Sequence, residues 1–140
     1  MSRKNPIKYC YHSKNRSKYL IKLHIVLATK YRKKLFIGKF AIDLKQTIFE
    51  ISNKSDFVID MMEVDKDHIH ILVDIEPQIS VSSIINRIKS MTTNRMWKQY
   101  QAFLSTKYWK EQTLFSDGYF VCSTGDASTE IILEYIKNQG

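Results

Sequence analysis

The sequence has little of what would place it among disulfide-stabilised, zinc-structural or membrane proteins. Its 140 residues include two cysteines, Cys10 and Cys122, which are too few and too far apart for a disulfide framework or a zinc motif. No apolar run approaches the length of a membrane span, and the charged start at residues 1–6 is not followed by the apolar segment of a signal peptide. Internal repeats and low-complexity tracts are also missing. The chain length fits one compact domain over residues 1–140, and these absences place it in the cytoplasm as an expectation.

Acidic residues are also in short supply. The chain has 14 Asp and Glu against 22 Lys and Arg, for a formal net charge of +8 and a pI near 9.5. This excess favours a polyanionic partner, either nucleic acid or an acidic membrane surface. Many of the charges lie in predicted loops and strand ends rather than on a basic amphipathic helix, so the pattern favours nucleic acid over a membrane. A basic protein that is merely soluble is the alternative.

The order of predicted elements is that of a ferredoxin-like α+β fold. Strands are indicated by apolar residues that alternate with period 2, and helices by apolar residues at a spacing of three to four. The order is βαββαβ, an antiparallel sheet with both main helices on one face, followed by an extra C-terminal helix. Residues 1–17 are polar and basic and are predicted to form an arm. The predicted strands are 18–29, 57–64, 68–75 and 114–122, the last of them interrupted at residues 117–118. The predicted helices are 39–53, a long helix that is capped by Ser80 or Ser82 and reaches about residue 100, and the stretch after Gly125.

Two histidines on the third predicted strand form a candidate metal site. Successive strand side chains point to opposite faces, so His68 and His70 share a face with Cα atoms about 6.5–7 Å apart, while Ile69 points toward the helices. Two imidazoles at this spacing can hold one divalent ion if a further ligand arrives from elsewhere. Taken alone the motif is weak, because two ordinary exposed strand histidines would look the same.

The last predicted helix carries Tyr135 and Gln139, which are four positions apart and therefore on one face. A phenol and an amide oxygen could thus face the same ion. An amide oxygen suits Mg²⁺ or Mn²⁺ and imidazole is tolerated by Mn²⁺, so the mixed ligand set favours phosphate chemistry over a structural zinc. By itself, the pair is more often a core tyrosine and a surface glutamine.

Taken together, these motifs resemble a known family. His68-Ile69-His70 resembles the His-hydrophobe-His motif, and residues 135–139 resemble the Tyr-x-x-x-Gln motif, of the TnpA-type single-tyrosine HUH transposases of very small bacterial insertion sequences. Residues 23–34 resemble that family's first strand and basic turn, and residues 115–125 resemble its last strand. The resemblance spans roughly residues 18–140 with four signatures in the same order. Members usually continue somewhat past the point that corresponds to Gly140, so a truncated chain whose last turn is frayed is expected.

The resemblance implies a metal-dependent single-strand DNA endonuclease and strand transferase. Its cofactor would be Mg²⁺ or Mn²⁺ held by His68, His70 and Gln139, and its nucleophile would be Tyr135. It would act on single-stranded DNA beside a hairpin, as a homodimer whose active sites are completed in trans by the tyrosine helix of the partner subunit. A phenol with a pKa of about 10 is a poor nucleophile unless a cation or base favours the phenolate. Attack would leave a 5′-phosphotyrosine and a free 3′-hydroxyl, and another 3′-hydroxyl could reverse the step without ATP.

Basic and aromatic residues extend the expectation to DNA binding, although each taken singly would more often be an ordinary surface or core residue. Tyr31, Tyr108 and Trp109 could stack on bases, but packing roles are favoured for them. Phosphate contacts are predicted for the basic turn and the second helix. The residues are Lys30, Arg32, Lys33, Lys34, Arg87, Lys89 and Arg95.

Two other functions stay open at this point. A non-catalytic single-stranded nucleic-acid binder of the RNA-recognition type would need an aromatic motif on the third strand, where His68 and His70 stand instead. A related HUH nuclease of replication initiation or repeat processing would share the chemistry and differ only in its DNA context, which the sequence barely separates.

Overall fold

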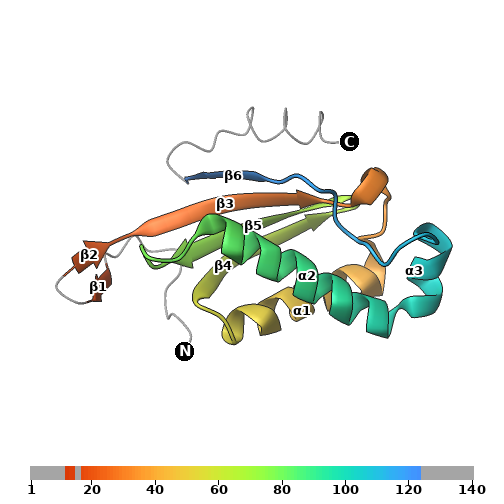
Figure 1. The fold of residues 1–140 in the computed structure, drawn as a ribbon, viewed down its shortest axis with the longest axis horizontal. Helices are drawn as coiled ribbons and strands as arrows, with labels where there is room; N and C mark the ends of the chain where they lie inside the picture. The colour runs from red at the N-terminus through yellow and green to blue at the C-terminus, as the bar shows by residue number, and fades with distance from the viewer. Residues whose placement is uncertain (1–11, 15–16, 124–140) are drawn as a thin grey trace.

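The computed structural model describes residues 12–14 and 17–123, and the chain folds in the predicted order (Figure 1). A four-stranded antiparallel sheet has the strand order β4-β5-β3-β6. This arrangement confirms the ferredoxin-like α+β fold. Its main elements are β3 (Ile21–Ala28), α1 (Gly38–Asn53), β4 (Phe57–Asp65), β5 (His68–Ile75), α2 (Val81–Gln99) and β6 (Phe120–Ser123).

Four short elements were not predicted. A small hairpin of β1 (His12–Lys14) and β2 (Ser17–Tyr19) occupies part of the predicted arm, at the end of the sheet away from α3 (Figure 1). The basic turn contains a 3-10 helix, η1 (Lys30–Arg32). α3 (Gln101–Lys107) follows α2 beyond the predicted end of that helix, because helical hydrogen bonding resumes beyond Tyr100 and buries Leu104 completely.

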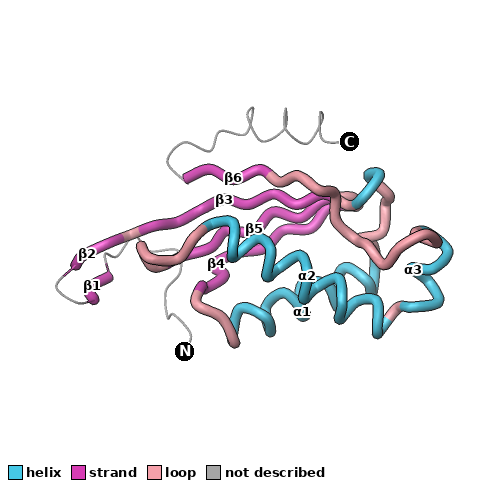
Figure 2. The backbone as a smooth tube through the Cα atoms, in the orientation of Figure 1, coloured by secondary structure: helices cyan, strands magenta, loops and turns pink. Residues whose placement is uncertain are grey.

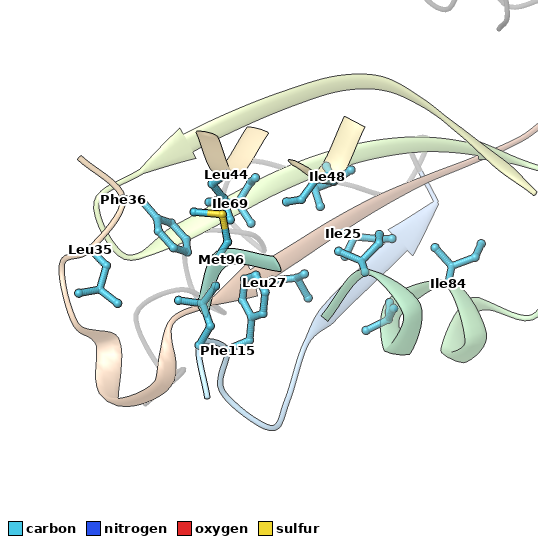
Figure 3. Close-up of a cluster of buried hydrophobic side chains, with 14 of the residues drawn as sticks. Ile25, Leu27, Leu35, Phe36, Leu44, Ile48, Ile69, Ile84, Met96 and Phe115 are labelled. Carbon is cyan, nitrogen blue, oxygen red and sulfur yellow. The ribbon is translucent and has the colours of Figure 1, made fainter. Parts of the chain in front are cut away.

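Both long helices pack on one face of the sheet, as Figure 2 shows. Alternate residues of the central strands, such as Ile25, Leu27 and Ile69, have no exposed surface and meet Leu44 of α1 and Met96 of α2 (Figure 3). Each fully buried aliphatic side chain of this size contributes about 1.5–3 kcal/mol relative to exposure. The alternation therefore fixes which face of each strand turns to the helices.

The starts of the two long helices differ in kind. Ser80 caps α2, because its side chain accepts a hydrogen bond from the backbone N–H of Ser83 at 3.1 Å. This confirms the predicted helix start. α1 has no side-chain cap, and it begins at Gly38 with a φ of 58°, a left-handed conformation that glycine adopts without steric cost.

The strand register assembles a second, polar face. In this register His70 lies opposite Val26 of β3 and Glu63 of β4, and His68 lies opposite Ala28 and Asp65. Directly paired residues project to the same side of a sheet. No helix among the described residues covers this side, which we call the histidine face. It includes Lys22, His24, Val26, Ala28, Asp60, Met61, Glu63, Asp65, His68, His70, Leu72 and Asp74.

Among residues 12–14 and 17–123, no helix has the length and apolar character needed to cross a membrane. The predicted C-terminal helix, with Tyr135 and Gln139, lies outside the described residues.

Candidate metal centre

Three imidazoles gather on the histidine face. The ring centres of His68 and His70 are 5.2 Å apart, and those of His70 and His24 are 5.6 Å apart. The shared face confirms the strand geometry predicted for His68-Ile69-His70. His68 is only 8% exposed, so the alternative of two ordinary exposed strand histidines does not describe it.

One nitrogen of His68 is held by its neighbour in the chain. The Nδ1 atom lies 2.9 Å from Oδ1 of Asp67, in position to donate its N–H to that carboxylate. This tautomer leaves the lone pair on Nε2 available to a ligand. Histidines that bind metals usually have such a carboxylate partner on the other nitrogen. The Nε2 atom lies 4.0 Å from Oδ2 of Asp65, on the solvent side of the strand pair.

The Asp67 carboxylate is itself fixed from the basic turn. Arg32 donates to its Oδ2 from Nε at 3.2 Å and reaches it from Nη2 at 3.1 Å. Burial alone would raise the pKa of the Asp67 carboxyl, but the hydrogen bonds from His68 and Arg32 outweigh burial and hold the pKa below its ordinary value. A second link comes from the backbone, because the N–H of Thr29 donates to the Asp67 carbonyl at 2.9 Å. The contacts therefore run from η1 through Asp67 to His68.

The other two histidines favour the neutral form that binds metals. Burial lowers the pKa of His70 first, and the neighbouring His68 and His24 lower it further. Burial also lowers the pKa of His24, against the opposing charge of Glu63. A neutral imidazole is the protonation state that a divalent ion requires.

The spacing of the first pair fits a shared ion. Two imidazole nitrogens that bind one ion at about 2.0–2.2 Å bring their ring centres to roughly 4.5–5.5 Å apart. The 5.2 Å between His68 and His70 falls in this range. No cluster of three or more His, Cys, Asp or Glu suited to a metal occurs within the part of the chain that the structure describes. The candidate site therefore has two histidines among the described residues, and the predicted third ligand, Gln139, lies outside them.

Comparison with known proteins gives the family. The family model described as "Transposase IS200 like" matches residues 17–139, nearly the whole chain. The chain belongs to this family. The match favours a transposase over the RNA-recognition module that the sequence left open.

Individual relatives agree with this assignment. The ISDra2 transposase TnpA of Deinococcus radiodurans is 26% identical over 121 residues, which cover 86% of this chain and 85% of the relative. The transposase for insertion sequence element IS200 of Salmonella typhimurium is 32% identical over 118 residues, which cover 84% of this chain and 76% of the relative.

Two solved structures share the fold of this IS200-like transposase. A crystal structure of a protein from Deinococcus radiodurans has a TM-score of 0.84 at 24% identity over 91% of this chain and 97% of the other. The REP-associated tyrosine transposase bound to a REP hairpin has a TM-score of 0.53 at 15% identity over 89% and 68%. At these identities the structural likeness supports the fold alone.

In this IS200-like transposase, the basic turn lies beside the histidines. Lys34 approaches Asp67 Oδ2 to 3.9 Å, and the Lys30 Nζ lies 3.9 Å from Glu111 and 3.5 Å from Asp117. The Lys33 carbonyl accepts the Thr29 hydroxyl at 2.8 Å. Four basic residues of this turn are predicted to contact phosphates. One of them, Arg32, is observed to hold the Asp67 carboxylate.

The basic residues predicted on α2 are not brought together with the histidines. They lie on the helix side of the sheet, where each bonds to protein groups. Arg87 donates to Ser55 and to the Lys54 carbonyl, and Arg95 pairs with Glu50 at 2.7 Å. The Lys89 ammonium donates to the carbonyls of Ser116 at 2.8 Å, Asp117 at 3.2 Å and Gly118 at 2.9 Å. Their contact with DNA stays a prediction.

Sequence reasoning missed a buried ionic cluster on the histidine face. The Lys22 ammonium donates to the carboxylates of Asp60 and Asp74, and the side chains of all three are at most 4% exposed. Burial alone would lower the pKa of Lys22, but the two carboxylates outweigh burial and raise it. The available signal was the alternation of β3 and β5, which puts Lys22 and Asp74 opposite each other on the side away from the helices. The cluster ties three strands together beside His24.

Proposed function

We propose that this transposase binds single-stranded DNA hairpins at the ends of its element and cuts and rejoins the strands through a 5′-phosphotyrosine. Membership of the IS200-like transposase family supports the role in transposition. The observation that carries the chemistry is the His68 and His70 pair, with Nδ1 of His68 hydrogen-bonded to Asp67 and its Nε2 free to bind an ion. A relative of the same fold was solved bound to a REP hairpin, which supports a hairpin as the DNA partner.

Tyr135 is the proposed nucleophile. Its phenol loses a proton, the phenolic oxygen attacks the scissile phosphorus, the bond from phosphorus to the 3′ oxygen breaks, and the departing 3′ oxygen takes up one proton. The products are a 5′-phosphotyrosine and a 3′-hydroxyl. Because the phosphodiester is exchanged rather than hydrolysed, a different 3′-hydroxyl can attack the phosphotyrosine and join new ends.

His68, His70 and Gln139 are the proposed ligands of a divalent ion, Mg²⁺ or Mn²⁺. When bound, such an ion withdraws charge from a non-bridging phosphate oxygen and favours the phenolate of the attacking tyrosine. The chain's contribution is orientation: Asp67 fixes the His68 ring, and burial keeps His70 neutral.

We also propose a homodimer in which the tyrosine helix of each subunit completes the histidine site of the other. The resemblance to the HUH transposases supports this exchange, as does the short polar segment at residues 123–126, in which Gly125 can redirect the chain after β6. A two-fold axis would then generate two equivalent sites.

A cleavage assay tests the proposed function directly. A labelled single strand with the hairpin from the element's end should be cut by the full chain with Mn²⁺ and should become covalently attached to protein. Excess EDTA should abolish both products, because the site depends on the ion. The same sequence annealed into a full duplex is the control and should stay intact. Cleavage that persists in EDTA would exclude the proposed metal site.

Asp67 provides a prediction about metal affinity. Replacing Asp67 with alanine removes the acceptor that fixes the His68 ring, so the Mn²⁺ dissociation constant should rise about 10- to 100-fold. Asp67→Asn keeps an acceptor oxygen and should recover part of the affinity. Mn²⁺ binding can be followed by electron paramagnetic resonance, and the His68 tautomer of the metal-free protein by ¹⁵N NMR.

The matched control is Asp56→Ala, which removes one carboxylate from an exposed residue outside the site. It should leave both the Mn²⁺ affinity and the His68 tautomer unchanged. If Asp67→Ala behaves like this control, Asp67 does not orient the ligand.

A further inference from the structure

A hollow with aromatic walls lies beside η1 and the end of α3. Its volume is about 480 Å³, within the roughly 300–1,000 Å³ usual for small-ligand sites. Its aromatic lining residues are Tyr31, Tyr108 and Trp109, and Lys107 and Lys110 line it as well. Tyr31 is 68% exposed and Trp109 is 76% exposed, so the packing role predicted for these two is wrong, whereas Tyr108 is 4% exposed and does pack. We call this hollow the aromatic pocket.

The backbone is strained at Tyr31, whose side chain is exposed. Tyr31 and Arg32 have φ values of 62° and 53°, the left-handed conformation that bulky side chains rarely adopt. Residues held in this conformation are strained, and such residues concentrate at ligand sites. The hydroxyl of Tyr108 donates to the Lys30 carbonyl at 2.8 Å and fixes the turn. Burial raises the pKa of Tyr108 to about 12, so this donor stays protonated.

Cations stand over the aromatic rings. The Lys110 ammonium is 5.0 Å from the Trp109 ring centre, that of Lys30 is 5.7 Å from Tyr31, and that of Lys33 is 5.8 Å from Tyr108. Glu111 is the acidic residue of the lining, and its carboxylate lies 3.9 Å from Lys30. Exposed ring faces next to several ammonium groups suit a ligand that combines a flat ring with a phosphate.

We propose that the aromatic pocket binds an unpaired base of single-stranded DNA, stacked on Tyr31 and Trp109, with the flanking phosphates near Lys30, Lys33 and Lys110. A base in a duplex is already stacked on both faces, so the pocket selects unpaired nucleotides. The proposal deepens the proposed function, on which it rests for the identity of the strand.

The aromatic pocket is linked to the histidine site through a few contacts. Tyr31 lies two residues after Thr29, whose N–H bonds to the carbonyl of Asp67, the residue that holds His68. η1 and α3 also lie at the same end of the sheet (Figure 1). A base anchored there would fix the path of the strand close to the histidine site without taking part in the reaction.

The probe is a single strand of twelve thymidines, compared with a twelve-unit abasic strand that keeps the phosphates and lacks the bases. Binding is measured in EDTA with the Tyr135→Phe chain, so that no cleavage intervenes. Stacking should quench the emission of Trp109, whereas Trp97 is only 5% exposed and should change little. Trp109→Ala should weaken binding of the thymidine strand about 5- to 100-fold and binding of the abasic strand hardly at all.

Three further variants complete the test, two in the pocket and one as a control outside it. Tyr31→Asn, which tolerates the left-handed backbone, should weaken thymidine binding in the same way, and Trp109→Phe should largely restore it. Tyr119→Ala is the matched control, because Tyr119 is 40% exposed with Lys89 5.8 Å from its ring centre but is not part of the pocket lining. It should bind like the parent chain.

The possible outcomes distinguish failure of the base-stacking proposal from failure of the proposed cleavage function. Equal losses for the thymidine and abasic strands would reduce the pocket to a phosphate contact and overturn the stacking proposal. So would unchanged thymidine binding in Trp109→Ala and Tyr31→Asn proteins whose thermal unfolding matches the parent. Failure of the cleavage assay with base-dependent binding intact would instead overturn the proposed function and leave the pocket standing.

Discussion

Replacing Tyr135 with phenylalanine should abolish strand cleavage and the covalent protein–DNA adduct while leaving hairpin affinity nearly intact. Only one hydroxyl is lost, and that hydroxyl is the proposed attacking group. Removing the nucleophile of an enzyme commonly lowers the rate on the order of 10³-fold or more. Hairpin binding relies instead on phosphate and base contacts elsewhere on the chain, so it should change little.

The measurement uses a labelled hairpin strand with Mn²⁺, resolved on a denaturing protein gel for the adduct and a sequencing gel for the cut. Tyr119→Phe is the control, since it removes a phenol hydroxyl from an exposed tyrosine and should cut at the parent rate. An adduct that survives in Tyr135→Phe would remove Tyr135 from the mechanism and require another nucleophile.

The main elements of the fold could be predicted because their periodicities are strong. The third predicted strand has the bounds of β5, His68–Ile75, since Ile69, Ile71 and Val73 mark one face without interruption. The short elements could not be predicted. α3 depends on the burial of Leu104 against the rest of the core, which is a tertiary effect that local pattern does not show.

The candidate site was predictable only in part. The shared face of His68 and His70 follows from strand alternation alone. The hydrogen-bond partner of His68 could not be predicted in this way. The short polar turn that ends at Asp67 looks like an ordinary hairpin connection, and only the fold brings Arg32 to it. The same holds for Lys22 and Asp60, since a register shift in β4 between Ile59 and Met61 decides where the Asp60 side chain goes.

The left-handed turn at Tyr31 and Arg32 could not be predicted from the sequence either. Neither residue type favours positive φ, so no local signal marks the conformation. It is stabilised by contacts that arrive from far along the chain, namely the Tyr108 hydroxyl on the Lys30 carbonyl and Asp67 on the Arg32 side chain. Local rules most often fail at functional or strained sites.

Mixing two inactive variants should restore cleavage if the sites form in trans. His70→Ala removes a proposed metal ligand, and Tyr135→Phe removes the proposed nucleophile, so each homodimer should be inactive. In a mixed dimer with trans sites, one site carries both lesions. The other combines intact histidines from the Tyr135→Phe subunit with an intact tyrosine from the His70→Ala subunit. That one site should cut.

The location of the label decides the arrangement more strictly than the recovered rate. If the two subunits differ in size through a tag, labelled DNA should appear only on the His70→Ala subunit, because that subunit alone keeps Tyr135. With random exchange of equal amounts, about half of the dimers are mixed and each has one working site, so recovery approaches about a quarter of the parent activity per subunit. In a cis arrangement every site carries one lesion, and the mixture stays inactive although mixed dimers form. No recovery, with mixed dimers demonstrated by pull-down of the untagged subunit, would overturn the exchange of the helix and leave the roles of Tyr135 and His70 unaffected.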